Sequence, residues 1–151
     1  MLDIESELLA LLKGFDAAGV PYALCGALAL AVHGCPRATK DIDIVVPAAN
    51  IPAAKAVARA CGFALEALPM RFRSSGVSIE RVSKLVNGRD LLMLDVLVGD
   101  ETLEGVWESR IGMPWQGRQL WTVSKPALVS MKLQAGRPQD LADVARLQEI
   151  S

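Results

Sequence analysis

The chain has 151 residues, 52% of them hydrophobic and 22% charged, and a formal net charge of −1. This hydrophobic content excludes an intrinsically disordered chain. The length is that of one domain with its own core, and no repeat, low-complexity linker or shift in composition divides it, so we expect a single domain over residues 1–151. The near-zero charge excludes the strong basic field that nucleic-acid-binding proteins usually carry, so an RNA ligand would have to bind a local basic patch.

Cysteine usage and the first residues indicate the compartment. The three cysteines, Cys25, Cys35 and Cys61, are odd in number and lack the spacing of a metal site, which suits a reducing environment. The first residues are acidic and do not form the basic start of a secretory signal. The longest uncharged stretch, residues 17–36, contains proline, glycine and histidine residues, which make it a poor candidate for a membrane-spanning helix. We therefore expect a soluble, cytoplasmic protein that does not enter a membrane.

The first half of the chain alternates between helical and strand patterns. Apolar residues recur at helical spacing from Ile4 to Phe15. Asp3 is in position to cap this predicted helix, and Gly19 lies just past its end. Four further elements are predicted: a short buried strand at 22–25, a short helix at 28–32, a β-branched strand at 42–46 and an alanine-rich helix at 51–61.

The second half of the chain predicts two hairpins and two helices. The dipeptide at 87–88 is Asn-Gly, the strongest short hairpin signal. The predicted elements are two strands at 77–86 and 90–98, a strand pair around 116–117, and two helices at 125–134 and 138–149. This order of helices and strands predicts an α/β (α+β) fold in which a mixed β-sheet is flanked by helices.

Two aspartates, Asp41 and Asp43, interrupt an otherwise apolar, β-branched run. Residues two apart in a strand point to the same face, so both carboxylates face one side while Ile42 and Ile44 face the other. Like charges at that spacing repel strongly unless a cation lies between them. The pattern predicts a divalent-metal site, and the turn at Gly26, one short helix upstream, predicts a phosphate-binding site beside it.

These residues resemble the nucleotidyltransferases of the DNA polymerase beta-like superfamily, whose signature is Gly-Gly or Gly-Ser, a short spacer, and Asp-x-Asp or Asp-x-Glu. The fuller pattern, Gly26-Ala27, His33-Gly34 and Arg37-x-Thr39-x-Asp41-Ile42-Asp43, is similar to the branch that contains the abortive-infection nucleotidyltransferase toxins. Ala27 stands where the family has glycine or serine. The resemblance implies the nucleotidyltransferase fold, catalytic and metal-binding roles for both aspartates, Mg²⁺ or Mn²⁺ as cofactor and an NTP as substrate.

A third aspartate, Asp95, is the only charged residue between Leu91 and Val98, so it needs a cation or strong hydrogen bonds. The resemblance implies that Asp95 completes the catalytic metal site with the first two aspartates. Three carboxylates around one or two Mg²⁺ ions suit nucleotidyl transfer, because the metal binds triphosphate oxygens and neutralises the leaving pyrophosphate. The alternative is a structural role, in which Asp95 caps a strand or pairs with Arg71 or Arg73.

The residues before and within the aspartate strand are further candidates for binding the nucleotide. Gly26 and Ala27 would offer backbone amides to the β- and γ-phosphates. Arg37 would hold phosphate, and Thr39 would orient an aspartate or the nucleotide. For these last two residues the alternative is a solvated loop with a local threonine hydrogen bond. His33, the only histidine, is interpreted as a packed or hydrogen-bonded residue rather than a catalytic one.

The segment from Lys132 to Asp143 resembles the C-terminal motif of the same branch, in which a lysine precedes Arg-x-Lys-Asp and a further aspartate. Gln139 replaces the second lysine here. The resemblance implies that Lys132 reaches the triphosphate as a point charge. Arg137 and Asp140 are interpreted mainly as part of an ion-pair network that fixes two helices.

Together these features predict an enzyme that moves a nucleoside monophosphate from an NTP to a hydroxyl acceptor and releases pyrophosphate. The resembled toxins act on tRNA ends, so RNA is one expected acceptor. The basic side chains between Arg71 and Arg89 would contact it, although a solvated sheet face explains them equally well. An antitoxin, another helical partner protein or a homodimer would then extend the docking surface. Two alternatives stay open: a small-molecule, antibiotic-type nucleotidyltransferase, and a catalytically degenerate module that binds nucleotide or a partner protein.

Overall fold

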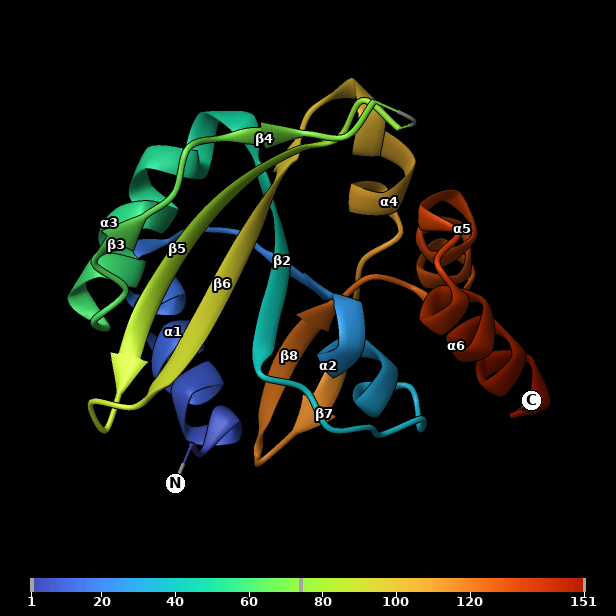
Figure 1. The fold of residues 1–151 in the computed structure, drawn as a ribbon, viewed down its shortest axis with the longest axis horizontal. Coiled ribbons are helices and arrows are strands. Elements are labelled where there is room, and N and C mark those ends of the chain that lie inside the picture. The colour runs from blue at the N-terminus through green and yellow to red at the C-terminus, as the bar shows by residue number, and fades with distance from the viewer. Residues whose placement is uncertain (1, 74, 151) are drawn as a thin grey trace.

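The protein is described by a computed structural model that covers residues 2–73 and 75–150 (Figure 1). The helices are α1 (Ile4–Ala18), α2 (Gly26–Val32), α3 (Ile51–Ala60), α4 (Glu104–Glu108), α5 (Lys125–Ala135) and α6 (Pro138–Glu149), with short 3₁₀ turns at Ala48–Asn50 and Glu101–Leu103. The strands are β1 (Ala23–Cys25), β2 (Asp41–Pro47), β3 (Leu65–Glu66), β4 (Met70–Arg71), β5 (Ser78–Val86), β6 (Asp90–Gly99), β7 (Ile111–Trp115) and β8 (Arg118–Thr122).

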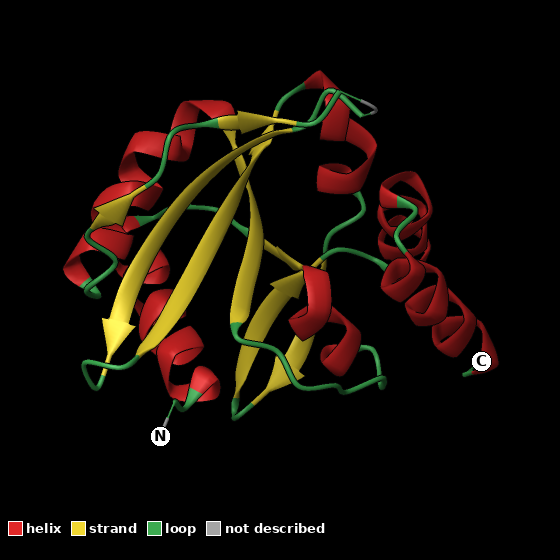
Figure 2. Ribbon diagram, viewed as in Figure 1, coloured by secondary structure: helices red, strands yellow, loops and turns green. Residues whose placement is uncertain are grey.

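All the described strands belong to one mixed sheet, which Figure 2 shows as a twisted layer between helices. The strand order is β3-β5-β6-β2-β1-β8-β7, and β4 pairs with β5 at the outer side. The central pair β2 and β6 is parallel, as is β1 with β8, while the hairpins β5–β6 and β7–β8 are antiparallel. The predicted mixed sheet flanked by helices is therefore confirmed.

One face of the sheet carries the main core. It packs against α1, whose Leu11, Leu12 and Phe15 are fully buried, and against α3. Ion pairs fix both helices to this face: Lys84 of β5 contacts Glu7 of α1, and neighbouring side chains of β5 and α3 pair in the same way. Side chains alternate along a strand, so the face that carries Arg81 and Asp95 is the opposite one.

Local signals account for the ends of the helices. Asp3 caps α1 by accepting a hydrogen bond from the Ser6 amide, and Gly19 ends the helix at a φ of 67°, both as predicted. Helix α6 begins at Pro138, again as predicted. The short elements β3, β4 and α4 were not predicted, because segments of two to five residues have no measurable periodicity. None of the helices in the described part of the chain is long and apolar enough to cross a membrane.

Candidate active site

The structure brings the three predicted carboxylates to one face of the sheet. Strands β2 and β6 pair in parallel register with Asp43 opposite Asp95, and Asp41 lies two residues earlier on β2. Because side chains alternate, all three aspartates share the face opposite α1 and α3. The intervening Ile42 and Ile44 point the other way and are 0% and 1% exposed.

The three carboxylates repel one another. Burial, followed by the charges of Asp95 and Asp41, raises the pKa of Asp43 from 3.8 to about 7. Burial and the nearby Asp95 also raise the pKa of Asp41. Lys132 and Arg81 act in the opposite direction on Asp43, but they do not cancel the effect. A cation bound between Asp41 and Asp43 would relieve this repulsion.

Arg81 is the direct partner of Asp95. The two residues face each other across the β5–β6 hairpin. The Arg81 Nε and Nη2 atoms donate to the two Asp95 carboxylate oxygens at 2.7 and 3.0 Å. The predicted alternative partners, Arg71 and Arg73, were therefore wrong. The hairpin signal could have identified Arg81: with Val86 opposite Asp90, counting equally outward along both strands reaches Arg81 and Asp95.

The glycine turn lies directly against Asp43. Gly26 has a φ of 67°, which L-residues rarely adopt. A Cβ added to Gly26 would lie 2.8 Å from the Asp43 Cγ, so the turn tolerates no side chain. Cys25 pairs with Asp43 across β1 and β2, and Ala27 follows in the first turn of α2 with its methyl group buried. The first amides of a helix have no hydrogen-bond partner within that helix. The proposed phosphate-binding role of Gly26 and Ala27 stays a prediction.

The donor set of this face suits a hard divalent cation. Carboxylate oxygens are the preferred ligands of Mg²⁺ and Mn²⁺, and the negative charges of Asp95 and Asp41 add to burial in raising the pKa of Asp43. Asp41 and Asp43 would hold such an ion. Asp95 is 7% exposed and has both oxygens bound by Arg81. Within residues 2–73 and 75–150, no group of three or more His, Cys, Asp and Glu side chains is arranged to hold a metal, so the three-aspartate site stays a prediction.

The loop that enters β2 is held by short-range contacts. The Thr39 hydroxyl accepts a hydrogen bond from the Asp41 amide at 2.9 Å, which is the local threonine contact considered above. This hydrogen bond also fixes the backbone at Asp41. Arg37 pairs with Asp143 of α6, with the Arg37 Nε 3.3 Å from the Asp143 Oδ1. The Arg37 side chain is 28% exposed and thus only partly open to a phosphate.

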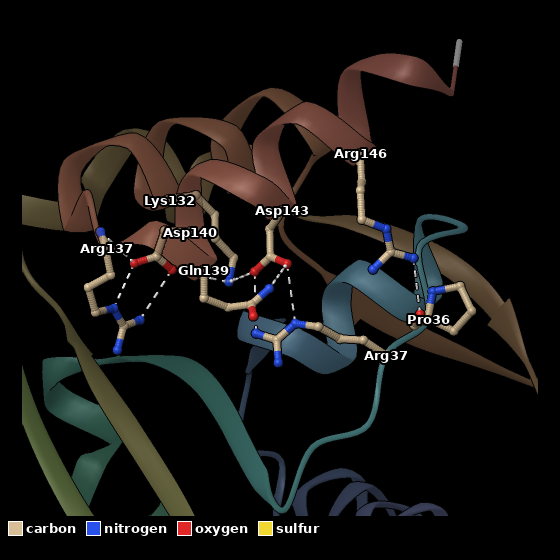
Figure 3. Close-up of polar contacts among 8 residues, drawn as sticks. All are labelled: Pro36, Arg37, Lys132, Arg137, Gln139, Asp140, Asp143 and Arg146. Atoms are coloured by element: carbon tan, nitrogen blue, oxygen red, sulfur yellow. Dashed lines mark hydrogen bonds and ion pairs between the residues drawn. The ribbon is translucent and has the colours of Figure 1, made fainter.

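Lys132 stands at the centre of a buried ion-pair cluster between α5 and α6 (Figure 3). The Lys132 Nζ lies 3.0 Å from Asp143 and 3.5 Å from Asp140. Arg137 donates to Asp140 through its backbone amide and its guanidinium group. Gln139, at the position of the family's second lysine, donates to Asp143 at 2.9 Å. We call these five residues, with Arg37, the C-terminal cluster.

The C-terminal cluster confirms the predicted network that fixes two helices. Lys132 is only 7% exposed, and its ammonium group is shared by two carboxylates rather than free at the end of a solvated stem. It is nevertheless close enough to lower the pKa of Asp43. Its role as a triphosphate ligand stays a prediction. The sequence could not reveal its burial, because that depends on how α6 folds back on α5.

Other candidate side chains have structural partners. The His33 Nε2 atom lies 2.8 Å from the Val123 carbonyl oxygen, which confirms the interpretation of His33 as a hydrogen-bonded residue. Among the basic residues of the central hairpin, Arg81 is bound to Asp95 and Lys84 contacts the helix-covered face. Two of the basic side chains expected to contact an RNA acceptor are therefore engaged within the protein.

No protein-family model matches the chain, and no curated protein matches it. Among solved structures, the lincosamide antibiotic adenylyltransferase LnuA bound to lincomycin has a TM-score of 0.65 and 18% identity, over 97% of this chain and 98% of that one. ANT(2″)-Ia in complex with adenylyl-2″-tobramycin has a TM-score of 0.64 and 18% identity, over 94% and 85%. An antigenic nucleotidyltransferase-like protein from Paracoccidioides brasiliensis has a TM-score of 0.59 and 15% identity, over 96% and 76%. These similarities establish that the chain has the predicted nucleotidyltransferase fold.

Proposed function

We propose that the protein is a metal-dependent nucleotidyltransferase that moves a nucleoside monophosphate from an NTP to a hydroxyl group and releases pyrophosphate. The observation that carries this proposal is the row of Asp41, Asp43 and Asp95 on one face of a nucleotidyltransferase-type sheet, with the Gly26 turn packed against Asp43. The negative charge of this row favours the binding of a cation. In a nucleotidyltransferase fold, the nucleotide would bind next to that cation.

Each residue of the row has a distinct part in the proposed reaction. A divalent ion held by Asp41 and Asp43 would neutralise charge on the triphosphate and lower the pKa of the attacking hydroxyl. Asp95 lies directly beside Asp43 and would complete the metal site. The Gly26–Ala27 turn would hold the outer phosphates through its amides. The acceptor oxygen then bonds to the α-phosphorus while the bond to the β-phosphate oxygen breaks, and the hydroxyl proton leaves to solvent.

We further propose that the acceptor is a small hydroxylated molecule. LnuA and ANT(2″)-Ia, two antibiotic adenylyltransferases of the same fold, support this choice, and LnuA is matched over almost its full length. The carboxylate face also carries two half-exposed apolar side chains, Leu85 and Leu91, which are paired near the β5–β6 turn. An apolar surface suits the body of a small molecule better than a polyanion. The RNA acceptor, the toxin role, the antitoxin and the homodimer implied by the sequence resemblance stay predictions.

Labelled transfer tests this proposal. The protein is incubated with each α-labelled NTP, Mg²⁺ or Mn²⁺, and one of three acceptors: lincomycin, tobramycin or bulk tRNA. We expect metal-dependent labelling of a small-molecule acceptor, and no labelling by Asp43→Asn. Labelling of tRNA alone would refute the small-molecule acceptor and favour the toxin-like transfer to RNA. Metal-dependent NTP binding without transfer to these acceptors or to a host lysate would indicate a nucleotide-binding module instead.

A further inference from the structure

Arg81 already supplies one positive charge to the row of carboxylates. Its guanidinium group holds both oxygens of Asp95, and its pKa is raised first by that hydrogen bond and further by the charges of Asp95, Asp41 and Asp43. The Asp95 side chain is 10% exposed, whereas that of Arg81 is 33% exposed. The carboxylate is therefore mostly buried, while the arginine is partly open to solvent.

This geometry conflicts with metal binding by Asp95. A carboxylate whose two oxygens already accept charge-assisted hydrogen bonds from one guanidinium group attracts a divalent ion less strongly than a free carboxylate does. We propose that Arg81 competes with the metal ion for Asp95, and that it turns to the anionic phosphates of the nucleotide once the metal displaces it. This inference rests on the proposed function, because it assumes that the metal binds at Asp41 and Asp43.

The exchange couples metal binding to nucleotide binding. In the absence of nucleotide, a metal ion that takes Asp95 costs Arg81 its two charge-assisted hydrogen bonds, and only solvent replaces them. In the presence of an NTP, the phosphate oxygens accept the planar donors of the displaced guanidinium. The two ligands therefore bind more tightly together than separately, and Arg81 is the residue that links them. By linkage, the metal raises the affinity for the NTP by the same factor.

Mn²⁺ binding followed by electron paramagnetic resonance tests the competition without measuring catalysis. In the absence of nucleotide, we expect Arg81→Met to bind Mn²⁺ at least tenfold more tightly than the wild type, because Asp95 is free. Arg81→Lys keeps the charge but loses the two-pronged geometry. It should also bind Mn²⁺ more tightly than the wild type, whereas a purely electrostatic effect of Arg81 would leave its affinity at the wild-type value. Arg89→Met, at an exposed arginine near the turn of the same hairpin, is the matched control and should not change the affinity.

Two further measurements complete the test. Adding a non-hydrolysable NTP should tighten Mn²⁺ binding in the wild type and much less in Arg81→Met. Arg81→Met/Asp95→Asn removes the pair without leaving a buried charge, and it should lose the gain seen in Arg81→Met. Unchanged or weaker Mn²⁺ binding in either Arg81→Met or Arg81→Lys would overturn the inference, provided that Asp43→Asn still abolishes binding. Failure of every variant and of the wild type to bind Mn²⁺ would instead overturn the proposed function.

Discussion

Replacing Asp43 by asparagine removes a carboxylate whose pKa is raised first by burial and then by the charges of Asp95 and Asp41. The pKa of Asp43 is about 7 in the folded protein, against an ordinary value of 3.8. Because the folded pKa is the higher one, the stability linked to this group is fully present below about pH 4 and is lost as the pH rises through about 7. A shift of about three pKa units corresponds to about 4 kcal/mol at 1.36 kcal/mol per unit, which sets the upper limit of the effect.

The assay is urea denaturation in EDTA between pH 4.5 and 8.5. The wild-type free energy of unfolding should fall by up to about 4 kcal/mol across this range relative to that of Asp43→Asn, which lacks the titrating group. Above pH 8 the variant should therefore be the more stable protein. Glu108→Gln, which removes an exposed carboxyl group on α4, is the control and should follow the wild-type profile.

On the proposed function, Mg²⁺ and NTP together should stabilise the wild type, and the same variant should lose this stabilisation because it lacks a proposed metal ligand. The opposite effects on the metal-free and the loaded protein distinguish a metal site from a merely structural carboxylate. Parallel pH profiles for the wild type and Asp43→Asn would refute the reasoning, because they would show that Asp43 ionises freely in the folded state.

Three more substitutions test the surroundings of the site. Lys132→Met should lower the free energy of unfolding by about 3 kcal/mol, because two buried carboxylates lose a shared cation; Lys40→Met, at a side chain that is 73% exposed, should change it by less than about 0.5 kcal/mol. Gly26→Ala should destabilise the protein more than Gly88→Ala: both glycines have positive φ, but only at Gly26 would the added methyl group overlap a carboxylate. Ala27→Ser should preserve or raise labelled transfer, and a loss of transfer would contradict the proposed position of the turn.

The fold was largely predictable because its main elements carry local signals. The N-terminal helix has a cap, a period and a terminal glycine within one short segment, and the β5–β6 hairpin has its Asn-Gly turn. The residues Asp41 and Asp43 could be assigned to one face because strand alternation depends only on sequence. Elements too short to show a period, such as α4, could not be found in this way.

The partners of the charged residues were harder to predict. Arg81 and Asp95 meet through the hairpin register, which a count from the turn could have given. Lys132 and Asp143 also lie close in the sequence, but their burial depends on α5 and α6 packing together and on Arg37 reaching them from the loop before β2. These tertiary contacts bury Lys132, which was expected to be free, and give it a structural role. The sequence pattern of a single helix does not predict such contacts.

The charges of the carboxylate row and of the C-terminal cluster fit the proposal that a metal ion and a nucleotide bind together. The row of Asp41, Asp43 and Asp95 has only Arg81 as an ion-pair partner on its own face in the described part of the chain, so it keeps an excess of negative charge. The C-terminal cluster has three cations for two carboxylates, and its Lys132 lowers the pKa of Asp43. A divalent ion alone would neutralise the negative charge of the row but would leave the displaced arginine unpaired. On the proposed function, a metal–nucleotide complex would satisfy both at once, because the ion would bind the carboxylates while the phosphates accepted hydrogen bonds from the arginine.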